Sequence, residues 1–241
     1  PKFAKMSNPG QAEQIYTALG DALQDINKFE ETFAGAFADQ NDVVLQLQHQ
    51  ADHDYHNLVL MPEYEHGWFS DINKAYLKKF LQEREINVVI EVGSWLGTST
   101  KFMAKQLPQG AKLYAVDHFK GDWAINRHEE HRALLPTLYE QFLSNMVHAG
   151  VQDKVIPIKH TTEEAFHILK GSIKADLIYI DAAHDTESVY KDIVMYSQLL
   201  AEDGILTGDD WGWASVRAAV ERYAAEHGKQ IGAEANFWYY Y

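Results

Sequence analysis

Short apolar runs alternate with amphipathic segments from residue 87 onward. The runs are rich in β-branched side chains, which is typical of strands buried on both faces of a parallel sheet. They cover residues 87–92, 112–116, 155–158, 177–180 and 204–207. The segments that separate and follow them carry apolar residues at helical spacing, over residues 99–107, 134–149, 162–170, 188–200 and 215–227. Strands alternating with helices predict an α/β fold with a Rossmann-like, doubly wound and mostly parallel sheet.

Upstream of this alternation the pattern is helical. Ser70 is a suitable N-cap for a helix over residues 70–84. Apolar residues also recur at helical spacing from Ile15 to Phe37, which predicts one or two amphipathic helices. We therefore expect an N-terminal helical extension, suited to a partner or lid role, followed by an α/β domain. The two predicted parts are residues 1–69 and 70–241.

Two further segments complete the expected architecture. Residues 230–232 and 237–241 are strand signals separated by a short loop, and they predict a terminal antiparallel hairpin at the sheet edge. Residues 121–135 form an insertion that is positioned to cover a substrate as a lid. The insertion contains His128 and His131, whose spacing of three does not match the zinc-binding H-E-x-x-H pattern.

Composition narrows the class of partner. The chain has 241 residues, 46% of them hydrophobic, and no apolar run near the roughly 18 residues that span a bilayer. It has no cysteine, which favours a reducing cytoplasm. Its formal charge is −14 without a basic cluster, so we expect neither nucleic acid nor membrane as a partner. A small-molecule substrate is favoured, and the acidic residues suit a divalent cation.

A glycine loop follows the first predicted strand. In the run from Glu91 to Gly97, Gly93 allows a tight turn against a ligand and Gly97 allows close approach of the next helix. The helix N-terminus at Thr98 suits the carboxylate of a ligand, while Glu91 suits an ammonium group. The spacing differs from the G-x-G-x-x-G of dinucleotide sites. A tight turn without a ligand stays open for the loop alone. The cofactor residues predicted here are Glu91, Gly93, Ser94, Gly97, Thr98 and Ser99.

The end of the second predicted strand supports a nucleoside. Asp117, followed by His118, stands where an acidic residue can bind a ribose diol. An exposed aspartate at a strand end is common, so Asp117 alone would carry little weight. Together with the glycine loop it indicates a nucleoside-containing cofactor.

Three aspartates end two later strands. Asp181 follows the strand at 177–180, and Asp209 and Asp210 follow the strand at 204–207. If these strands are neighbours, the carboxylates converge and repel one another unless a cation lies between them. We therefore predict Mg²⁺ bound by Asp181, Asp209 and Asp210, with Asp181 also facing the cofactor. The alternative is that one aspartate caps a helix while the others face solvent.

His184 lies three residues after Asp181, on the turn into the next predicted helix. Imidazole titrates near neutral pH, so His184 is our candidate general base for a substrate hydroxyl. A histidine that only caps the turn is the alternative. Candidate aromatic walls for the substrate are Trp123, Trp211 and Trp213, each of which also suits ordinary hydrophobic cover. Metal binding by His49, His53 and His56 is not favoured, because their stretch is rich in Gln and Asp.

These motifs resemble the class I S-adenosylmethionine-dependent methyltransferases. Within that class they are similar to the metal-dependent O-methyltransferases of the macrocin type, with cephalosporin-hydroxylase-like and catechol O-methyltransferase proteins as more distant relatives. The matching segments are residues 91–94, 115–117, 138–145, 176–184 and 204–211. The resemblance implies that residues 70–241 form a methyltransferase domain, that the three aspartates ligate Mg²⁺ and that His184 stands where some relatives place the base. It also implies that the adenine lies near His160, Thr161 and Thr162.

The sequence departs from that pattern at two places. His160 stands where the family often has glycine, and Ala182-Ala183 replaces the usual Gly/Ala-Asp pair. The extension before Tyr55 matches nothing in the family. The local geometry at both departures is therefore open.

The predicted function is transfer of a methyl group from S-adenosylmethionine to a hydroxyl of a sugar, polyketide or phenolic acceptor, with help from Mg²⁺. A catalytically silent S-adenosylmethionine-binding or scaffold protein is the main alternative, with the N-terminal helices as a partner or homo-oligomer surface. A nicotinamide-dependent oxidoreductase is disfavoured by the missing third glycine and by the three aspartates.

Overall fold

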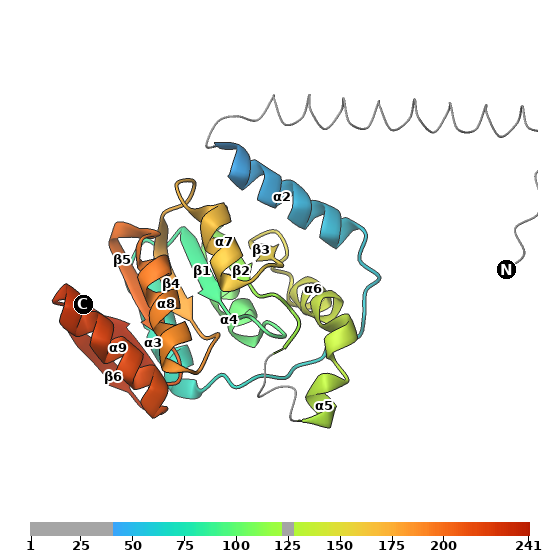
Figure 1. Cartoon of the computed structure of the whole chain (residues 1–241). Coiled ribbons are helices and arrows are strands. Elements are labelled where there is room, and N and C mark those ends of the chain that lie inside the picture. The colour runs from blue at the N-terminus through green and yellow to red at the C-terminus, as the bar shows by residue number, and fades with distance from the viewer. Residues whose placement is uncertain (1–40, 122–127) are drawn as a thin grey trace, which may run out of the picture. The chain divides into compact units, whose positions relative to one another are not determined.

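A computed structural model describes residues 41–121 and 128–241 (Figure 1). The helices predicted between Ile15 and Phe37, and Trp123 within the insertion, lie outside the described residues. Contacts group residues 43–241 into one compact unit, which contains the whole sheet. Among the described residues, no helix is both long and apolar enough to cross a membrane.

The core is a seven-stranded sheet in the order β3-β2-β1-β4-β5-β7-β6. Strands β1 to β5 run parallel, whereas β7 is antiparallel to both β5 and β6. This confirms the doubly wound sheet and the terminal hairpin. The strands are β1 (Val88–Val92), β2 (Lys112–Val116), β3 (Val155–Ile158), β4 (Ala175–Ile180), β5 (Leu200–Gly208), β6 (Ile231–Glu234) and β7 (Phe237–Tyr240).

Strand β5 begins earlier than its apolar run. The sequence predicts a helix up to Leu200 and a strand from Gly204, but the helix ends at Ser197 and the strand starts at Leu200. Leu200 pairs with Ala175, and the register shifts before Leu177 pairs with Ile205. The first part of β5 is therefore an irregular, partly exposed extension, which lacks the apolar signal of a buried strand.

Helices cover both faces of the sheet (Figure 1). One core cluster joins the sheet to α7, α8 and α9, and the other joins it to α3, α4 and α6. Pro136 lies in the first turn of the short helix η2, so the regular helix predicted from 134 begins only at Leu138. The helices are α2 (Asn41–His56), α3 (Asp71–Glu83), α4 (Thr98–Gln106), α5 (Glu129–Arg132), η2 (Leu135–Thr137), α6 (Leu138–Ala149), α7 (Thr162–Leu169), α8 (Thr186–Ser197) and α9 (Ala214–His227).

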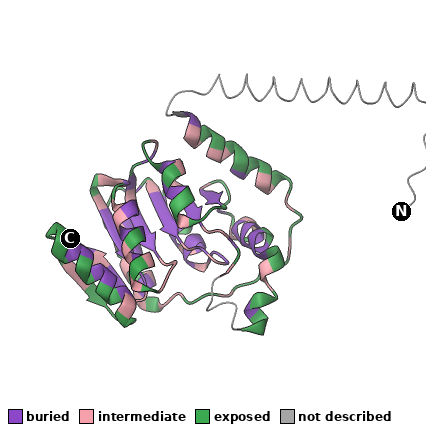
Figure 2. Ribbon diagram, viewed as in Figure 1, coloured by how far each residue is buried: buried purple, intermediate pink, exposed green. Residues whose placement is uncertain are grey.

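Strand β1 shows why the apolar runs are continuous. Ile90 and Val92 belong to the core cluster under α7–α9, whereas Val89 belongs to the cluster under α3, α4 and α6. Alternate residues thus face two covered sides, and both need apolar side chains. Figure 2 shows the result, with buried strands between helices whose outer surfaces are exposed. Glu91 is the one charged residue in this apolar strand, and it is completely buried on the α3–α4 side.

Residues 57–70, which we call the strap, run from α2 to α3 across α4 and α6. The backbone N–H of Tyr64 donates to Asn145 Oδ1 at 3.0 Å, and Asn145 Nδ2 donates back to the Tyr64 carbonyl at 2.8 Å. Lys101 of α4 is buried and pairs with Glu63 and Glu65 at 3.2 and 2.7 Å. The strap therefore packs on the α/β unit, while the predicted domain boundary at residues 69/70 stays a prediction.

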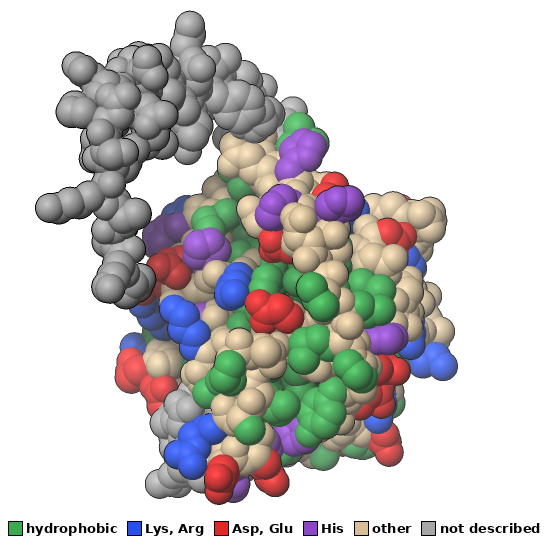
Figure 3. All heavy atoms as spheres, turned by 90° about the vertical axis from the view of Figure 1, so that its right-hand side faces the viewer, with side chains coloured by type: hydrophobic (Ala, Val, Ile, Leu, Met, Phe, Trp, Pro, Cys, Tyr) green, Lys and Arg blue, Asp and Glu red, His purple; other side chains and the backbone are tan. Residues whose placement is uncertain are grey.

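Large hydrophobic side chains are exposed along the strap. Val59 and Trp68 are 85% and 61% exposed, and Leu60 and Tyr64 are also exposed. Figure 3 shows the side of the molecule that carries this segment, where hydrophobic side chains lie among acidic and basic ones. Helix α2 packs more firmly, because Ala51 is buried and the Tyr55 hydroxyl donates to the carbonyl of Val155 at the edge of the sheet.

Candidate functional site

The glycine loop lies against the end of β4. Gly93 has φ +92°, and a Cβ atom there would stand 2.0 Å from the Asp181 carbonyl oxygen. Gly97, with φ +81°, precedes α4, and a Cβ there would stand 2.3 Å from Met146 Cε. Both positions combine a left-handed backbone with close contact, so only glycine fits them. The loop is thereby held next to the first of the three aspartates.

Glu91 lies beneath this loop with its carboxylate enclosed. It accepts hydrogen bonds from Ser94 Oγ at 2.9 Å, from Ser99 Oγ at 2.5 Å and from the Thr100 hydroxyl. Burial outweighs these donors and raises the pKa of Glu91 to about 7. Glu91 therefore holds the start of α4, and its contact with a cofactor ammonium stays a prediction.

Asp117 also holds the loop. Its Oδ2 accepts the backbone N–H groups of Ser94 at 3.1 Å and Trp95 at 2.9 Å, and its Oδ1 accepts that of Phe119 at 2.6 Å. A carboxylate can accept about four hydrogen bonds, so a hydroxyl can still join these three. His118 is half-buried beside it, with Nδ1 3.9 Å from Asp117 Oδ1. Asp117 thus lies beside the glycine loop, while the contacts of Asp117 and His118 with a cofactor stay a prediction.

Three of the four non-glycine residues with positive φ in the described part of the chain lie at the carboxyl ends of parallel strands, and the fourth, Ala235, lies in the β6–β7 turn. Trp95, Phe119 and Asp210 have φ values of +47°, +54° and +62°, and they follow β1, β2 and β5. Residues other than glycine rarely adopt a positive φ. Such strain persists where the surrounding structure imposes it, often at functional sites. Ligands of doubly wound sheets bind at this same edge. The strain thus marks the edge that the glycine loop and aspartates share.

Asp181 is the centre of negative charge at this edge. Strands β4 and β5 are adjacent, which places Asp181 near Asp209 and Asp210, as the sequence predicts. Desolvation, followed by the charges of Asp209, Asp210 and Glu91, raises the pKa of Asp181 well above its usual value. A bound cation would relieve this repulsion.

Asp209 is buried in a polar network that reaches across the sheet to α3. It accepts hydrogen bonds from Asn73 and Tyr179, and Asn73 Nδ2 donates to the Tyr179 hydroxyl at 2.9 Å. The backbone N–H of Asp210 also donates to Asp209 Oδ1 at 2.7 Å. Desolvation still raises the pKa of Asp209. Asn73 and Tyr179 are therefore site-supporting residues that the sequence pattern did not identify.

His184 pairs with one of the three aspartates. Its Nε2 lies 2.9 Å from Asp210 Oδ2, and both side chains are about one-fifth exposed, at 23% and 20%. The ring of Trp213 lies 5.0 Å from that of His184, and Trp213 is 47% exposed. A carboxylate in this position orients the imidazole and stabilises its protonated form. The arrangement can move a proton at a solvent-accessible edge.

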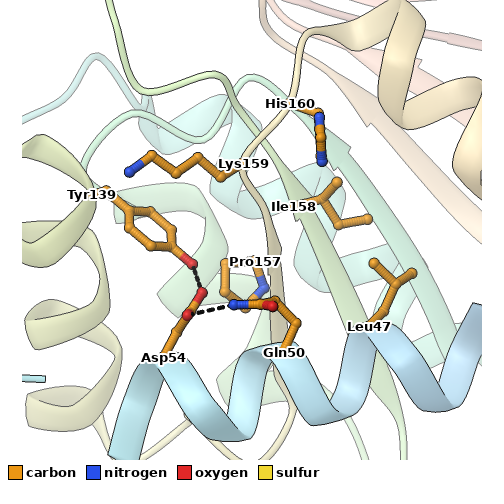
Figure 4. A pocket seen from close by; sticks show the side chains of 8 residues that line it. All are labelled: Leu47, Gln50, Asp54, Tyr139, Pro157, Ile158, Lys159 and His160. Carbon is orange, nitrogen blue, oxygen red and sulfur yellow. Dashed lines mark hydrogen bonds between the residues drawn. The ribbon is translucent and has the colours of Figure 1, made fainter. Parts of the chain in front are cut away.

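The residues predicted near the adenine surround the end of β3. Thr161 caps α7, with its hydroxyl and backbone both paired to Glu164, while Thr162 is half-buried behind it. His160 is exposed and lines a cavity of 320 Å³ between α2 and β3 (Figure 4). Opposite it, Asp54 of α2 is hydrogen-bonded to Tyr139 and to Gln50. The cavity lining thus combines apolar side chains, such as Leu47 and Ile158, with charged ones, such as Asp54 and Lys159.

The described residues contain no cluster of side chains that is positioned to bind a metal ion. No set of three or more His, Asp or Glu side chains within residues 41–121 and 128–241 is placed to hold a metal ion. His49, His53 and His56 are all exposed on α2. The aspartates nonetheless fit a hard cation in kind, because they are oxygen donors, and burial together with the charges of Asp209 and Asp210 raises the pKa of Asp181.

Comparison with known proteins identifies the family. Residues 90–211, which run from β1 to just beyond Asp210, match the family described as a methyltransferase domain. The chain belongs to this methyltransferase family. The match spans the glycine loop, Asp117, Asp181 and His184, and it confirms the resemblance drawn from the sequence. A search of curated proteins gave no match to this methyltransferase.

Solved structures share the fold of this methyltransferase. A candidate O-methyltransferase from Klebsiella pneumoniae aligns with a TM-score of 0.57 at 17% identity, covering 89% of this chain and 96% of that one. An O-methyltransferase from Bacillus cereus in complex with SAH aligns at 0.54 and 14%, covering 88% and 96%. An O-methyltransferase of tomaymycin synthesis from Streptomyces achromogenes, in complex with SAM, gives 0.54 and 14%, covering 88% and 94%. The aligned parts cover 88–89% of this chain, so the likeness extends beyond residues 90–211.

Proposed function

We propose that this methyltransferase transfers the methyl group of S-adenosylmethionine to a hydroxyl group of a small molecule. The observation that carries the proposal is the His184–Asp210 pair, 2.9 Å apart, at the sheet edge where the glycine loop meets Asp181. A hydroxyl is a poor nucleophile until its proton is removed, and a histidine oriented by a carboxylate can remove it near neutral pH. The O-methyltransferases that share the fold support this choice of acceptor atom.

The glycine loop is the proposed cofactor site. When bound, S-adenosylmethionine supplies an electrophilic methyl group on a positively charged sulfur. The backbone N–H groups at Thr98 and Ser99 suit its carboxylate, and Asp117 suits its ribose hydroxyls. Asp181 faces Gly93 and would lie beside the cofactor's charged groups. His160, Thr161 and Thr162 are the proposed neighbours of the adenine.

His184 and Asp210 carry out the proposed proton transfer. If His184 Nε2–H donates to Asp210, Nδ1 would be the ring nitrogen that accepts the proton of the acceptor hydroxyl. Nδ1 is buried, so a local movement would have to uncover it before the hydroxyl reaches it. The bound cofactor would supply its methyl group to the hydroxyl oxygen and leave as S-adenosylhomocysteine, while His184 would hold the hydroxyl proton until it passes to solvent. Asp210 stabilises the resulting imidazolium.

Asp181, Asp209 and Asp210 would hold Mg²⁺ in this proposal. A bound cation lowers the pKa of a coordinated hydroxyl and thus assists its deprotonation. Sugar, polyketide and phenolic compounds are the proposed acceptors, since the exposed face of Trp213 beside His184 suits a ring.

Calorimetric titration with S-adenosylhomocysteine, with and without Mg²⁺, tests the cofactor and the cation separately. We expect saturable binding that depends on the glycine loop, and methyl transfer to at least one member of a hydroxyl-bearing panel that falls when EDTA is added. Binding without turnover on the whole panel would favour a catalytically silent protein. Stabilisation by NAD(H) but not by S-adenosylhomocysteine would overturn the proposal.

A further inference from the structure

Two histidines from distant segments meet above the glycine loop. The indole Nε1–H of Trp95 donates to Nδ1 of His66 in the strap at 3.2 Å. The Nε2 atom of His66 lies 3.2 Å from Nε2 of His131 in α5. His131 is only 7% exposed, and the Trp68 ring packs edge-on against both imidazoles, at 4.9 and 5.3 Å. This cluster is separate from the His184–Asp210 pair.

The contacts fix one protonation pattern. Because His66 Nδ1 accepts from Trp95, the proton of neutral His66 is on Nε2. That Nε2–H must then donate to His131 Nε2, so neutral His131 carries its proton on Nδ1. The series of donors runs in one direction, from Trp95 to His66 to His131, and it exists only while both imidazoles are neutral.

Protonation of either ring breaks the series. A protonated His66 has no lone pair for the Trp95 indole, and a protonated His131 has none for His66. Two protonated rings whose Nε2 atoms lie 3.2 Å apart would also repel each other. His131 Nδ1 is buried without a hydrogen-bond partner, so the described surroundings offer its proton no acceptor that would stabilise a charge.

The surrounding charges are few and mostly distant from the two rings. On α5, Glu130 Oε1 lies 3.8 Å from His131 Nε2, and the His128 ring lies 5.1 Å from that of His131. On the strap, the Tyr64 ring stacks with the His66 ring at a centroid distance of 6.5 Å, and Glu63 and Glu65 form ion pairs with Lys101 of α4. Glu130 favours protonation of His66, but desolvation and His131 outweigh it and lower the pKa of His66 below 6.5.

Trp95 connects the cluster to the cofactor loop. It lies two residues after Gly93 and has the strained φ of +47°, which its surroundings must maintain. Its backbone N–H donates to Asp117, and its side chain donates to His66. The strap contacts the loop a second time, through Thr98 Oγ1 and the His66 carbonyl at 3.3 Å.

We propose that His66 and His131 are positioning residues that hold Trp95 and the glycine loop in the cofactor-binding conformation only while both imidazoles are neutral. The inference rests on the proposed function, because it assumes that the cofactor binds at this loop. Acidification from pH 8 to pH 5.5 should then release the Trp95 side chain and weaken cofactor binding. We expect affinity for S-adenosylhomocysteine to fall about tenfold through this cluster, the ratio that about 1.4 kcal/mol of lost hydrogen bonding gives.

The test follows the Trp95 indole N–H directly by two-dimensional ¹H–¹⁵N NMR of the full chain between pH 8 and 5.5, without ligand. Trp95→Phe identifies the resonance. In the wild type it should shift with a single midpoint below pH 6.5. The double variant His66→Gln/His131→Gln keeps acceptors and donors in the same order but cannot titrate, so its resonance should not move. His53→Gln, on the exposed surface of α2, is the matched control and should behave as the wild type.

Calorimetry with S-adenosylhomocysteine over the same pH range supplies the second measurement. The loss of affinity on acidification should be about tenfold larger in the wild type than in the double variant. Because both proteins contain Glu91 and the other titratable groups, the comparison removes the contributions of those groups to the pH dependence. An indole resonance that is independent of pH would overturn the inference, as would the same pH-dependent shift in the double variant. Failure of every variant to bind S-adenosylhomocysteine at any pH would instead overturn the proposed function, and the NMR result would still decide whether the histidines act on Trp95.

Discussion

The carboxylates in the two halves of the candidate site have different surroundings. At the ends of β1 and β2, Glu91 accepts three hydroxyls and Asp117 accepts three backbone N–H groups. At the ends of β4 and β5, Asp181, Asp209 and Asp210 lie near one another, and Asp181 keeps a raised pKa. Burial raises the pKa of both Glu91 and Asp181, but at Asp181 the charges of Asp209 and Asp210 add to it, and a bound cation would relieve that repulsion. The difference suggests a rigid cofactor half and a reactive half.

The sharpest way to separate the two halves is to remove the proposed base. His184→Ala should lower kcat by about 10²–10⁴-fold, since general base catalysis contributes that much. S-adenosylhomocysteine affinity should change less than about threefold, because the glycine loop is intact. Steady-state kinetics and calorimetry measure both quantities. Asp210→Asn is the companion variant, and an equal loss of rate and affinity in His184→Ala would contradict the base role.

Asp181→Ala tests the reactive half at its centre. The variant should lose metal-dependent turnover while it keeps the fold, because removing one of three mutually repelling carboxylates relieves strain. Circular dichroism should therefore show an unchanged or higher Tm at pH 8. The rate in Mg²⁺ and in EDTA checks the cation, and turnover equal to the wild type would rule out the three-aspartate proposal.

Glu91→Gln tests the cofactor half. The pKa of Glu91 is raised to about 7 from 4.5, so ionisation of this buried carboxyl weakens the fold as the pH rises from 4.5 through 7. The penalty approaches about 3 kcal/mol above pH 7, at about 1.4 kcal/mol per pKa unit. Glutamine cannot ionise, so the variant should gain up to that amount over the wild type at pH 8 and almost nothing at pH 4.5. Urea unfolding at the two pH values measures it, and an equal difference at both would refute the assignment.

Asn145→Ala probes the strap, which contacts the glycine-loop half of the site. The side chain donates to the carbonyls of Leu96 and Tyr64 and accepts the Tyr64 N–H, so its loss leaves these groups unpaired. We expect a cost of about 2 kcal/mol in unfolding free energy. Gln48→Ala, whose side chain makes an exposed contact on α2, is the control and should cost less than about 0.5 kcal/mol. A smaller loss for Asn145→Ala than for this control would show that the strap is dispensable.

The strands and the residues at their ends were predictable, because a strand buried on both faces leaves an apolar run that a short motif follows. Asp117, Asp181, Asp209 and Asp210 could be placed at one edge from this alone. The Asp209 network could not, since Asn73 and Tyr179 are 106 residues apart and Tyr179 lies within an apolar run. A polar residue such as Asn73 among the apolar positions of a helix was the available signal. His66 gave none, because a single histidine in an irregular segment has no period.

The strap has a consequence for how this enzyme can be divided. The family match begins at Ile90, yet Asn73 supports Asp209, and the strap satisfies polar groups of α6 and contacts Trp95. A fragment cut at the edge of sequence similarity would keep every residue of the recognisable motifs and lose the partners that shape them. Chimeras that exchange catalytic domains among these methyltransferases should therefore be joined upstream of the strap, because the unit that folds together is longer than the unit that sequences share.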